Sequence, residues 1–153
     1  MRTKIYRYTE CGLDNVFLEG VDVLQDDHGD EVYRIENILD LHKLIAYAII
    51  SRRGGLSGPE LRFLRSEMGL TQEELAKRLG CTRVTISRWE RNEEAINLNA
   101  EVVVKLLTAE KLDIDPDMSI EDMALNSDWS AQVTEIRIDG SDPQHYKRIQ
   151  EAA

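Results

Sequence analysis

The side chains best suited to recognition chemistry lie close together, in residues 82–92 of the 153-residue chain. Arg83, Thr85 and Arg88 are polar and alternate with Ile86 and Trp89, which point the same way on a helix. The planar fork of a guanidinium can donate two hydrogen bonds to the O6 and N7 acceptors of guanine in the major groove. We therefore predict a helix that presents these polar side chains to DNA.

Catalytic and metal chemistry have much less support. The sequence shows no Gly-rich phosphate loop and no nucleophile with an ordered base. Cys11, His28 and His42 are scattered, whereas structural zinc needs four ligands at characteristic spacings. The alternating aspartates of residues 113–117 lack the glycine and closing glutamate of a calcium loop. We predict a protein that is not an enzyme and that holds no cofactor and no metal.

The predicted recognition helix is one of three helices that begin within residues 57–92. A Ser or Thr followed three residues later by Glu is the capping-box spacing, and glycine ends a helix at little steric cost. The starts are Ser57 with Glu60, Thr71 with Glu74, and Thr82, and the stops are Gly69, Gly80 and Asn92. Two short helices joined by a tight glycine turn predict a helix-turn-helix over residues 71–92.

The stretch LTQEELAKRLGCTRVTISRWERN resembles the helix-turn-helix of the lambda-repressor/Cro class, or XRE family. The resemblance implies that Gln72 contacts phosphate and that Arg83, Val84 and Arg88 read bases. It also implies a buried ion pair between Arg65 and Glu90. The predicted DNA-binding set is Thr71, Gln72, Thr82, Arg83, Val84, Thr85 and Arg88. The family usually has glycine where this chain has Asn92.

The first 54 residues predict a small β-rich module with one helix. Short β-branched and aromatic runs at 5–8, 16–18, 21–24 and 32–35 predict an antiparallel sheet, and Gly29 indicates a hairpin. Asn37 and Asp40 provide a cap-like start for a helix over residues 38–52, which carries a broad apolar stripe.

This module, followed by LSGPELRFLR, resembles the MqsA-type antitoxins and their regulator relatives. In the toxin–antitoxin members of that group the N-terminal module masks the toxin, and the C-terminal domain dimerises on the operator. Many members hold the module together with zinc through two Cys-x-x-Cys pairs. This chain contains no Cys-x-x-Cys, so the resemblance does not extend to that zinc site.

Beyond the motif, Asn99 predicts the cap of a helix that ends near Lys111, and Ser119 predicts the cap of a short helix through Leu125. Residues 132–138 alternate as a strand, which could pair either with its copy in a dimer or with the N-terminal sheet. The predicted segments are therefore the module (1–54), a five-helix lambda-repressor-like domain (55–127), and a C-terminal strand with a polar, frayed tail (128–153). Together they define an α+β fold.

The net charge of −10 argues at first against a nucleic-acid partner. Residues 57–109, however, carry eight positive and eight negative charges, while residues 110–142 carry two positive and ten negative. Non-specific affinity for DNA should be weak, because it scales with the number of phosphates that Lys and Arg neutralise and residues 57–109 have no excess of positive charge. We find no apolar leader at the N-terminus and no apolar run long enough to span a bilayer. The two cysteines are seventy residues apart, which indicates reduced thiols and not a disulfide framework. Both observations predict a cytoplasmic protein without a membrane partner.

The leading hypothesis is a sequence-specific repressor that binds double-stranded operator DNA as a homodimer and acts as a toxin-binding antitoxin. One alternative is a stand-alone regulator whose N-terminal module binds an effector or a protein. Another is an adaptor whose helix-turn-helix contacts only protein. DNA binding separates the first two hypotheses from the third, and a toxin partner separates the first from the second.

Overall fold

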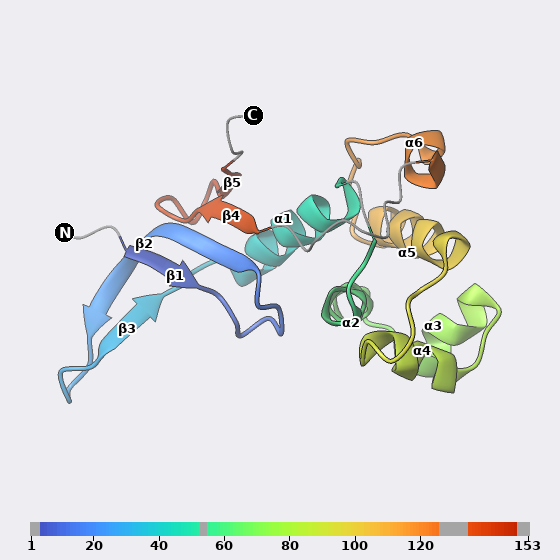
Figure 1. Cartoon of the computed structure of the whole chain (residues 1–153). Helices are drawn as coiled ribbons and strands as arrows, with labels where there is room; N and C mark the ends of the chain where they lie inside the picture. Colours follow the sequence, from blue (N-terminus) through green and yellow to red (C-terminus); the bar gives the residue numbers. More distant parts are fainter. Residues whose placement is uncertain (1–3, 53–54, 126–134, 150–153) are drawn as a thin grey trace. The chain divides into compact units, whose positions relative to one another are not determined.

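The computed structural model describes residues 4–52, 55–125 and 135–149. The chain divides into two compact units, one made of residues 1–45 with 134–153 and the other of residues 46–133. Helix α1 (Ile38–Ile50) begins in the first unit and ends in the second (Figure 1). Among the described residues, no helix has the length and apolar character needed to cross a membrane.

The first unit contains a five-stranded sheet. Its strands are β1 (Lys4–Arg7), β2 (Val16–Gln25), β3 (Glu31–Arg34), β4 (Ile136–Asp139) and β5 (Lys147–Arg148). The order is β1-β2-β4-β5, and β3 pairs with the far end of β2. The antiparallel pairs β1–β2 and β2–β3 confirm the predicted N-terminal sheet, and the β2–β3 turn closes on Gly29, at φ +81°.

Strand β2 is longer than the sequence predicted. Two separate runs were expected, at 16–18 and 21–24, but the structure has one ten-residue strand through both. Gly20 lies in its middle at φ +77°, a left-handed conformation that glycine adopts without a steric penalty. The glycine therefore changes the course of the strand instead of ending it, and β3 pairs only with residues after it.

Strand β4 joins the N-terminal sheet, one of the two alternatives left open by the sequence. It runs parallel to β2, with Val16 opposite Ile136 and Leu18 opposite Ile138. Where the sequence predicted a polar, frayed tail, the chain instead turns after Asp139 and adds β5, antiparallel to β4. The first part of the predicted strand, residues 132–134, lies outside the described residues.

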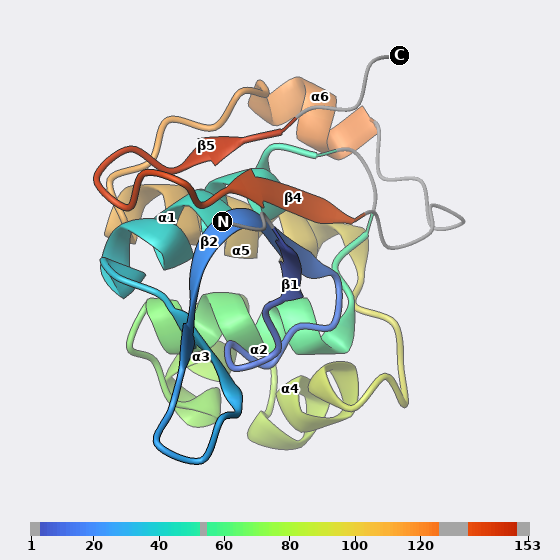
Figure 2. The same ribbon diagram turned by 90° about the vertical axis from the view of Figure 1, so that its left-hand side faces the viewer.

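The core of the first unit consists of apolar side chains that alternate along β2 and β4, together with side chains from α1 and from the segment before β2. Its fully or almost fully buried residues are Leu13, Val16, Leu18, Leu41, Ile45, Ile136 and Ile138. Figure 2 shows the start of α1 behind β2 and β4. Two polar contacts fasten this helix, because the Tyr8 hydroxyl meets His42 Nε2 at 2.8 Å and Asn37 Nδ2 donates to the carbonyl of Pro143 at 3.0 Å.

The second unit is helical. After the end of α1 it contains α2 (Gly58–Glu67), α3 (Gln72–Leu79), α4 (Arg83–Glu90), α5 (Leu98–Lys111) and α6 (Ile120–Leu125). The five helices α2–α6 match the number predicted for the helix-turn-helix domain. Its core contains Ile49, Leu61, Leu64, Leu75, Ile86, Trp89 and Val104, all buried.

One predicted helix cap was wrong. The Asn97 side chain, not that of Asn99, caps α5, and its Oδ1 accepts a hydrogen bond from the backbone of Ala100 at 2.8 Å. The cap of α6 is confirmed, since Ser119 Oγ accepts from the backbone of Asp122.

Candidate nucleic-acid interface

Helices α3 and α4 form the helix-turn-helix that the sequence predicted. Thr71 caps α3 in a complete capping box with Glu74, and Gly80 ends this helix in a left-handed conformation at φ 68°. Thr82 then caps α4 two residues later. The three-residue turn is this short because Gly80 reverses the chain without a side-chain clash.

Helix α4 buries one face and exposes another. Ile86 and Trp89 are 0% and 5% exposed and hold the helix against the core. Arg83 and Arg88 are exposed, and Val84 is 49% exposed although it is apolar. An exposed apolar side chain between two exposed arginines suits the mixed surface of the major groove, where a G·C pair offers the guanine acceptors and an A·T pair the thymine methyl group.

The three predicted threonines occupy helix starts. The Thr71 hydroxyl accepts from the backbone of Glu74 at 3.1 Å, and the Thr82 hydroxyl accepts from the backbone of Thr85 at 3.3 Å. In return, the hydrogen bond from the Thr71 backbone, followed by that from its side chain, lowers the pKa of the Glu74 carboxyl. The Thr82 and Thr85 hydroxyls also lie 3.1 Å apart. These threonines therefore fix the starts of α3 and α4.

Arg65 and Glu90 lie together, as the resemblance implied. Arg65 donates to Glu90 from Nε at 2.7 Å and from Nη2 at 3.0 Å, and to the carbonyl of Leu70 from Nη1 at 2.9 Å. The Glu90 side chain is 4% exposed and that of Arg65 15%. This bidentate pair connects α2 to the end of α4 and to the turn before α3.

Gln72 joins the same pair, a contact that the sequence analysis missed. Its Nε2 donates to Glu90 Oε1 at 3.2 Å, so one carboxylate oxygen accepts from both Gln72 and Arg65. Gln72 is the first residue of α3 and is half-buried. No local sequence signal indicated this contact, because eighteen residues separate the two side chains.

Asn92 fills the place where the resembling family usually has glycine. It adopts a left-handed φ of 57°, and its Oδ1 accepts from the backbone of Gly58 at 2.8 Å. A Cβ atom at Gly58 would lie only 2.3 Å from the carbonyl oxygen of Glu90. Asn92 thus meets the backbone requirement and also ties the start of α2 to the end of α4.

A buried group of four charges in the second unit was also missed. Arg52 pairs with Glu60 and donates to the carbonyl of Gly55, while Lys105 Nζ lies 3.2 Å from Glu101 Oε1. All four charged side chains are at most 9% exposed. Burial raises the pKa of the Glu101 carboxyl against the opposing attraction of Lys105. The four-residue spacing of Glu101 and Lys105 was the available signal.

The residues weighed for zinc are engaged elsewhere in the first unit. His42 meets the Tyr8 hydroxyl, Cys11 Sγ lies 3.5 Å from the carbonyl of Tyr8, and His28 lies in the exposed β2–β3 turn. Within the described part of the chain, no three His, Cys, Asp or Glu side chains are grouped as metal ligands.

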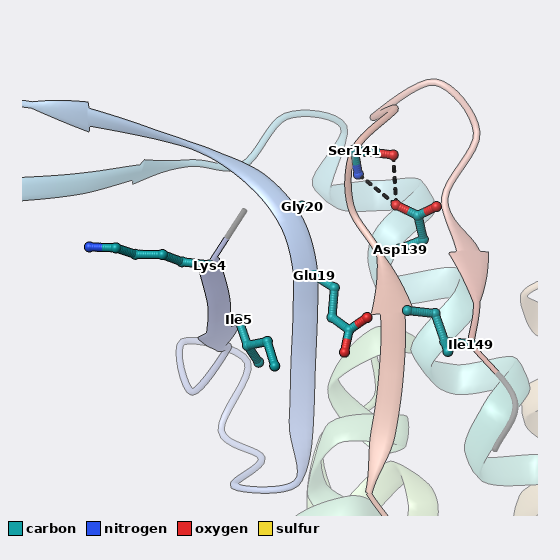
Figure 3. Close-up of a pocket in the computed structure, with 7 residues that line it drawn as sticks. All are labelled: Lys4, Ile5, Glu19, Gly20, Asp139, Ser141 and Ile149. Atoms are coloured by element: carbon teal, nitrogen blue, oxygen red, sulfur yellow. Dashed lines mark hydrogen bonds between the residues drawn. The ribbon is translucent and has the colours of Figure 1, made fainter. Parts of the chain in front are cut away.

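A pocket of about 480 Å³ opens on the sheet of the first unit. Its lining residues are Lys4, Ile5, Glu19, Gly20, Asp139, Ser141 and Ile149 (Figure 3). The charged side chains already have partners: Ser141 donates twice to Asp139, Lys4 pairs with Glu31, and Glu19 lies 3.7 Å from Arg137. Lys4 also points away from the other lining side chains. The pocket therefore indicates no ligand class.

The capped helix pair, its buried arginine–glutamate pair and the exposed basic face of α4 define a helix-turn-helix domain. Residues 61–117 match the family model described as Helix-turn-helix. The chain therefore contains a helix-turn-helix domain.

A curated relative shares 36% identity over 83 residues, which are 51% of this chain and 27% of the relative. It comes from Sulfurisphaera tokodaii and carries the provisional name HTH-type transcriptional regulatory protein. The chain spans about a quarter of the length of that relative. No solved structure matches this chain significantly.

Proposed function

We propose that this protein is a sequence-specific DNA-binding transcriptional repressor without enzymatic activity. The observation that carries the proposal is the surface of α4, where Arg83, Val84 and Arg88 are exposed while Ile86 and Trp89 are buried. A helix of this kind enters the major groove with the residues of its N-terminal half toward the base edges. Gln72, at the start of α3, supplies a phosphate contact that sets the orientation of the domain.

The distribution of charge favours a homodimer for the proposed repressor. A chain of net charge −10, in which residues 57–109 carry eight positive and eight negative charges, gains little non-specific attraction to DNA. One recognition helix reads only a few base pairs, and a symmetric dimer reads two half-sites about one helical turn apart. We infer that a homodimer on a two-fold symmetric operator provides the affinity that bulk charge does not.

The test is a set of alanine variants titrated against a duplex that the wild-type protein selects from a random-sequence pool. Arg83→Ala and Arg88→Ala should each lose about 1–3 kcal/mol on the selected duplex and much less on a shuffled one. Gln72→Ala should weaken binding to both duplexes, because phosphate contacts carry no sequence information. Arg62→Ala, at an exposed arginine of α2, is the matched control.

Two results would refute this assignment. If wild-type protein selects no sequence, the adaptor alternative takes its place. If Arg83→Ala and Arg88→Ala both bind the selected duplex as Arg62→Ala does, α4 is not the reading helix.

A second proposal concerns a protein partner of the first unit, and the β2–β3 hairpin favours it. Leu24 and Val32 lie opposite each other in this hairpin and are 50% and 45% exposed. Residues 22–34 carry five carboxylates and one arginine. An exposed apolar pair within an acidic rim suits a basic protein that inserts an apolar side chain, since charge complementarity speeds encounter and orients docking.

The other face of the hairpin is fixed within the first unit. Tyr33 stacks on Tyr6 with ring centroids 4.2 Å apart, and Lys4 pairs with Glu31. In the turn, Asp26 Oδ1 accepts from the backbones of His28 and Asp30, both at 2.9 Å. The hairpin is therefore preorganised, which lowers the entropic cost of docking.

The antitoxin hypothesis requires that this basic partner be a toxin encoded beside this gene. Full-length protein co-expressed with a growth-inhibiting basic neighbour should restore growth, and Leu24→Asp/Val32→Asp should not, while both bind DNA equally. Ile120→Asp, at another exposed apolar residue, is the control and should restore growth. Rescue by the hairpin variant would exclude this surface. A neighbour that the wild-type protein neither binds nor neutralises would favour the stand-alone regulator.

A further inference from the structure

We propose that Glu90 is a positioning residue for DNA binding, which holds the Gln72 amide ready for phosphate before the DNA arrives. The inference rests on the proposed function, because it concerns the same contact between α3 and the DNA backbone. It assigns to Glu90 a role beyond its ion pair with Arg65.

The first step is the fixed position of the Glu90 carboxylate. Its two oxygens accept from Arg65 Nε at 2.7 Å and Nη2 at 3.0 Å, and the side chain is 4% exposed. Arg65 is itself held, since Nη1 donates to the carbonyl of Leu70 at 2.9 Å. A carboxylate gripped by a bidentate guanidinium has one geometry, and so provides a rigid acceptor for a further donor.

The second step is the orientation of the Gln72 amide. A carboxylate only accepts hydrogen bonds, so the Gln72 nitrogen, not its oxygen, faces Glu90 Oε1, at 3.2 Å. An amide nitrogen carries two hydrogens, and one of them remains for another acceptor. Because Gln72 is the first residue of α3, that hydrogen lies at a helix N-terminus, where the backbone N–H groups also attract an anion.

The third step is the local charge. Only the Gln72 amide would separate Glu90 from the expected phosphate, and an unpaired carboxylate there would repel the DNA. Arg65 neutralises it, so the pair can orient Gln72 without an electrostatic penalty. Arg65, Glu90 and Gln72 belong to α2, α4 and α3, and the network therefore sets the phosphate contact relative to the reading helix (Figure 1).

The test is a mutant cycle that removes the positioning carboxylate without leaving a buried charge alone. Gln72→Ala is measured in the wild-type chain and in Arg65→Met/Glu90→Leu, with the selected duplex and its shuffled version as probes. Without Glu90 the Gln72 side chain must be ordered during binding, so the double variant should bind both duplexes about two- to tenfold more weakly. Adding Gln72→Ala to it should then cost much less than it costs in the wild-type chain.

Three measurements make the result decisive. Thermal melts followed by circular dichroism establish that each variant is folded at the assay temperature. Glu90→Gln, which keeps an acceptor for the Gln72 amide, should retain most of the effect of Gln72→Ala. Glu73→Gln, which changes the charge of the neighbouring exposed carboxylate, should leave that effect unchanged.

An equal loss from Gln72→Ala in the wild-type and double-variant backgrounds overturns the inference. A Gln72→Ala chain that binds both duplexes as the wild type does also overturns it, while the proposed function stands if the Arg83 and Arg88 variants are impaired. Failure of the wild-type chain to bind DNA overturns the proposed function instead.

Discussion

Removing the positive partner of the Arg65–Glu90 pair should strongly destabilise the second unit. In Arg65→Met, a carboxylate that is 4% exposed loses both hydrogen bonds from the guanidinium and keeps only Gln72. Leaving one buried charge of a pair alone costs about 3–5 kcal/mol. In Arg65→Met/Glu90→Leu no charge is stranded, and the main loss is the donor to the carbonyl of Leu70, worth about 1 kcal/mol.

Urea unfolding followed by tryptophan fluorescence measures both values. Trp89 directly precedes Glu90 and is 5% exposed, so in a Trp129→Phe background it reports on this site alone. With a denaturant slope of about 2 kcal/mol per molar, Arg65→Met should lower the midpoint by roughly 2 M and the double variant by about 0.5 M. Arg62→Met, at an exposed position of the same helix, should change it little. Equal midpoints for the single and double variants would refute the reasoning.

Three further predictions concern the close helix contact, the buried charges and metal content. Gly58→Ala should destabilise the second unit by about 1–3 kcal/mol in urea melts, because its Cβ would overlap the Glu90 and Trp89 carbonyl oxygens; unchanged stability would mean that the helices separate freely. Burial raises the pKa of the Glu101 carboxyl in the folded state, so the free energy of unfolding should fall as pH rises above the ordinary carboxyl pKa. Glu101→Gln should flatten that part of the curve of stability against pH. Parallel curves for the wild type and the variant would contradict burial as the cause. Native mass spectrometry should find no stoichiometric zinc, and chelator should leave the melting temperature unchanged; about one zinc per chain would contradict this.

The local elements of this fold could be predicted because their signals are contained in a few residues. The capping boxes of Thr71 and Ser57 need only a side chain and a backbone three residues away, and both are present. Asn97 and Asn99 show the limit of such signals. Either residue suits a helix start, and only the packing of α5, which buries Ala100 and Val104, distinguishes them.

The features that escaped prediction depend on contacts between distant residues. The 3.2 Å contact between Gln72 and Glu90 exists because α3 and α4 pack against each other, and no spacing rule reports it. The choice of β2 as the partner of β4 joins residues 120 positions apart in the chain. Hydrophobic alternation defines a strand but not its neighbour, so the sequence left both alternatives open.

Because β2 pairs with β4, the sheet of the first unit cannot be completed until translation has passed Asp139. The ribosome releases residues 4–25 early, but β4 and β5 are synthesised only after the whole helical unit. The helix-turn-helix can therefore fold during translation while β2 still lacks one neighbour, although domains usually fold from the N-terminus onward. During that interval Val16 and Leu18, fully buried in the finished protein, lie on an open strand edge that can recruit other nascent chains. A premature stop codon near residue 135 would make that state permanent.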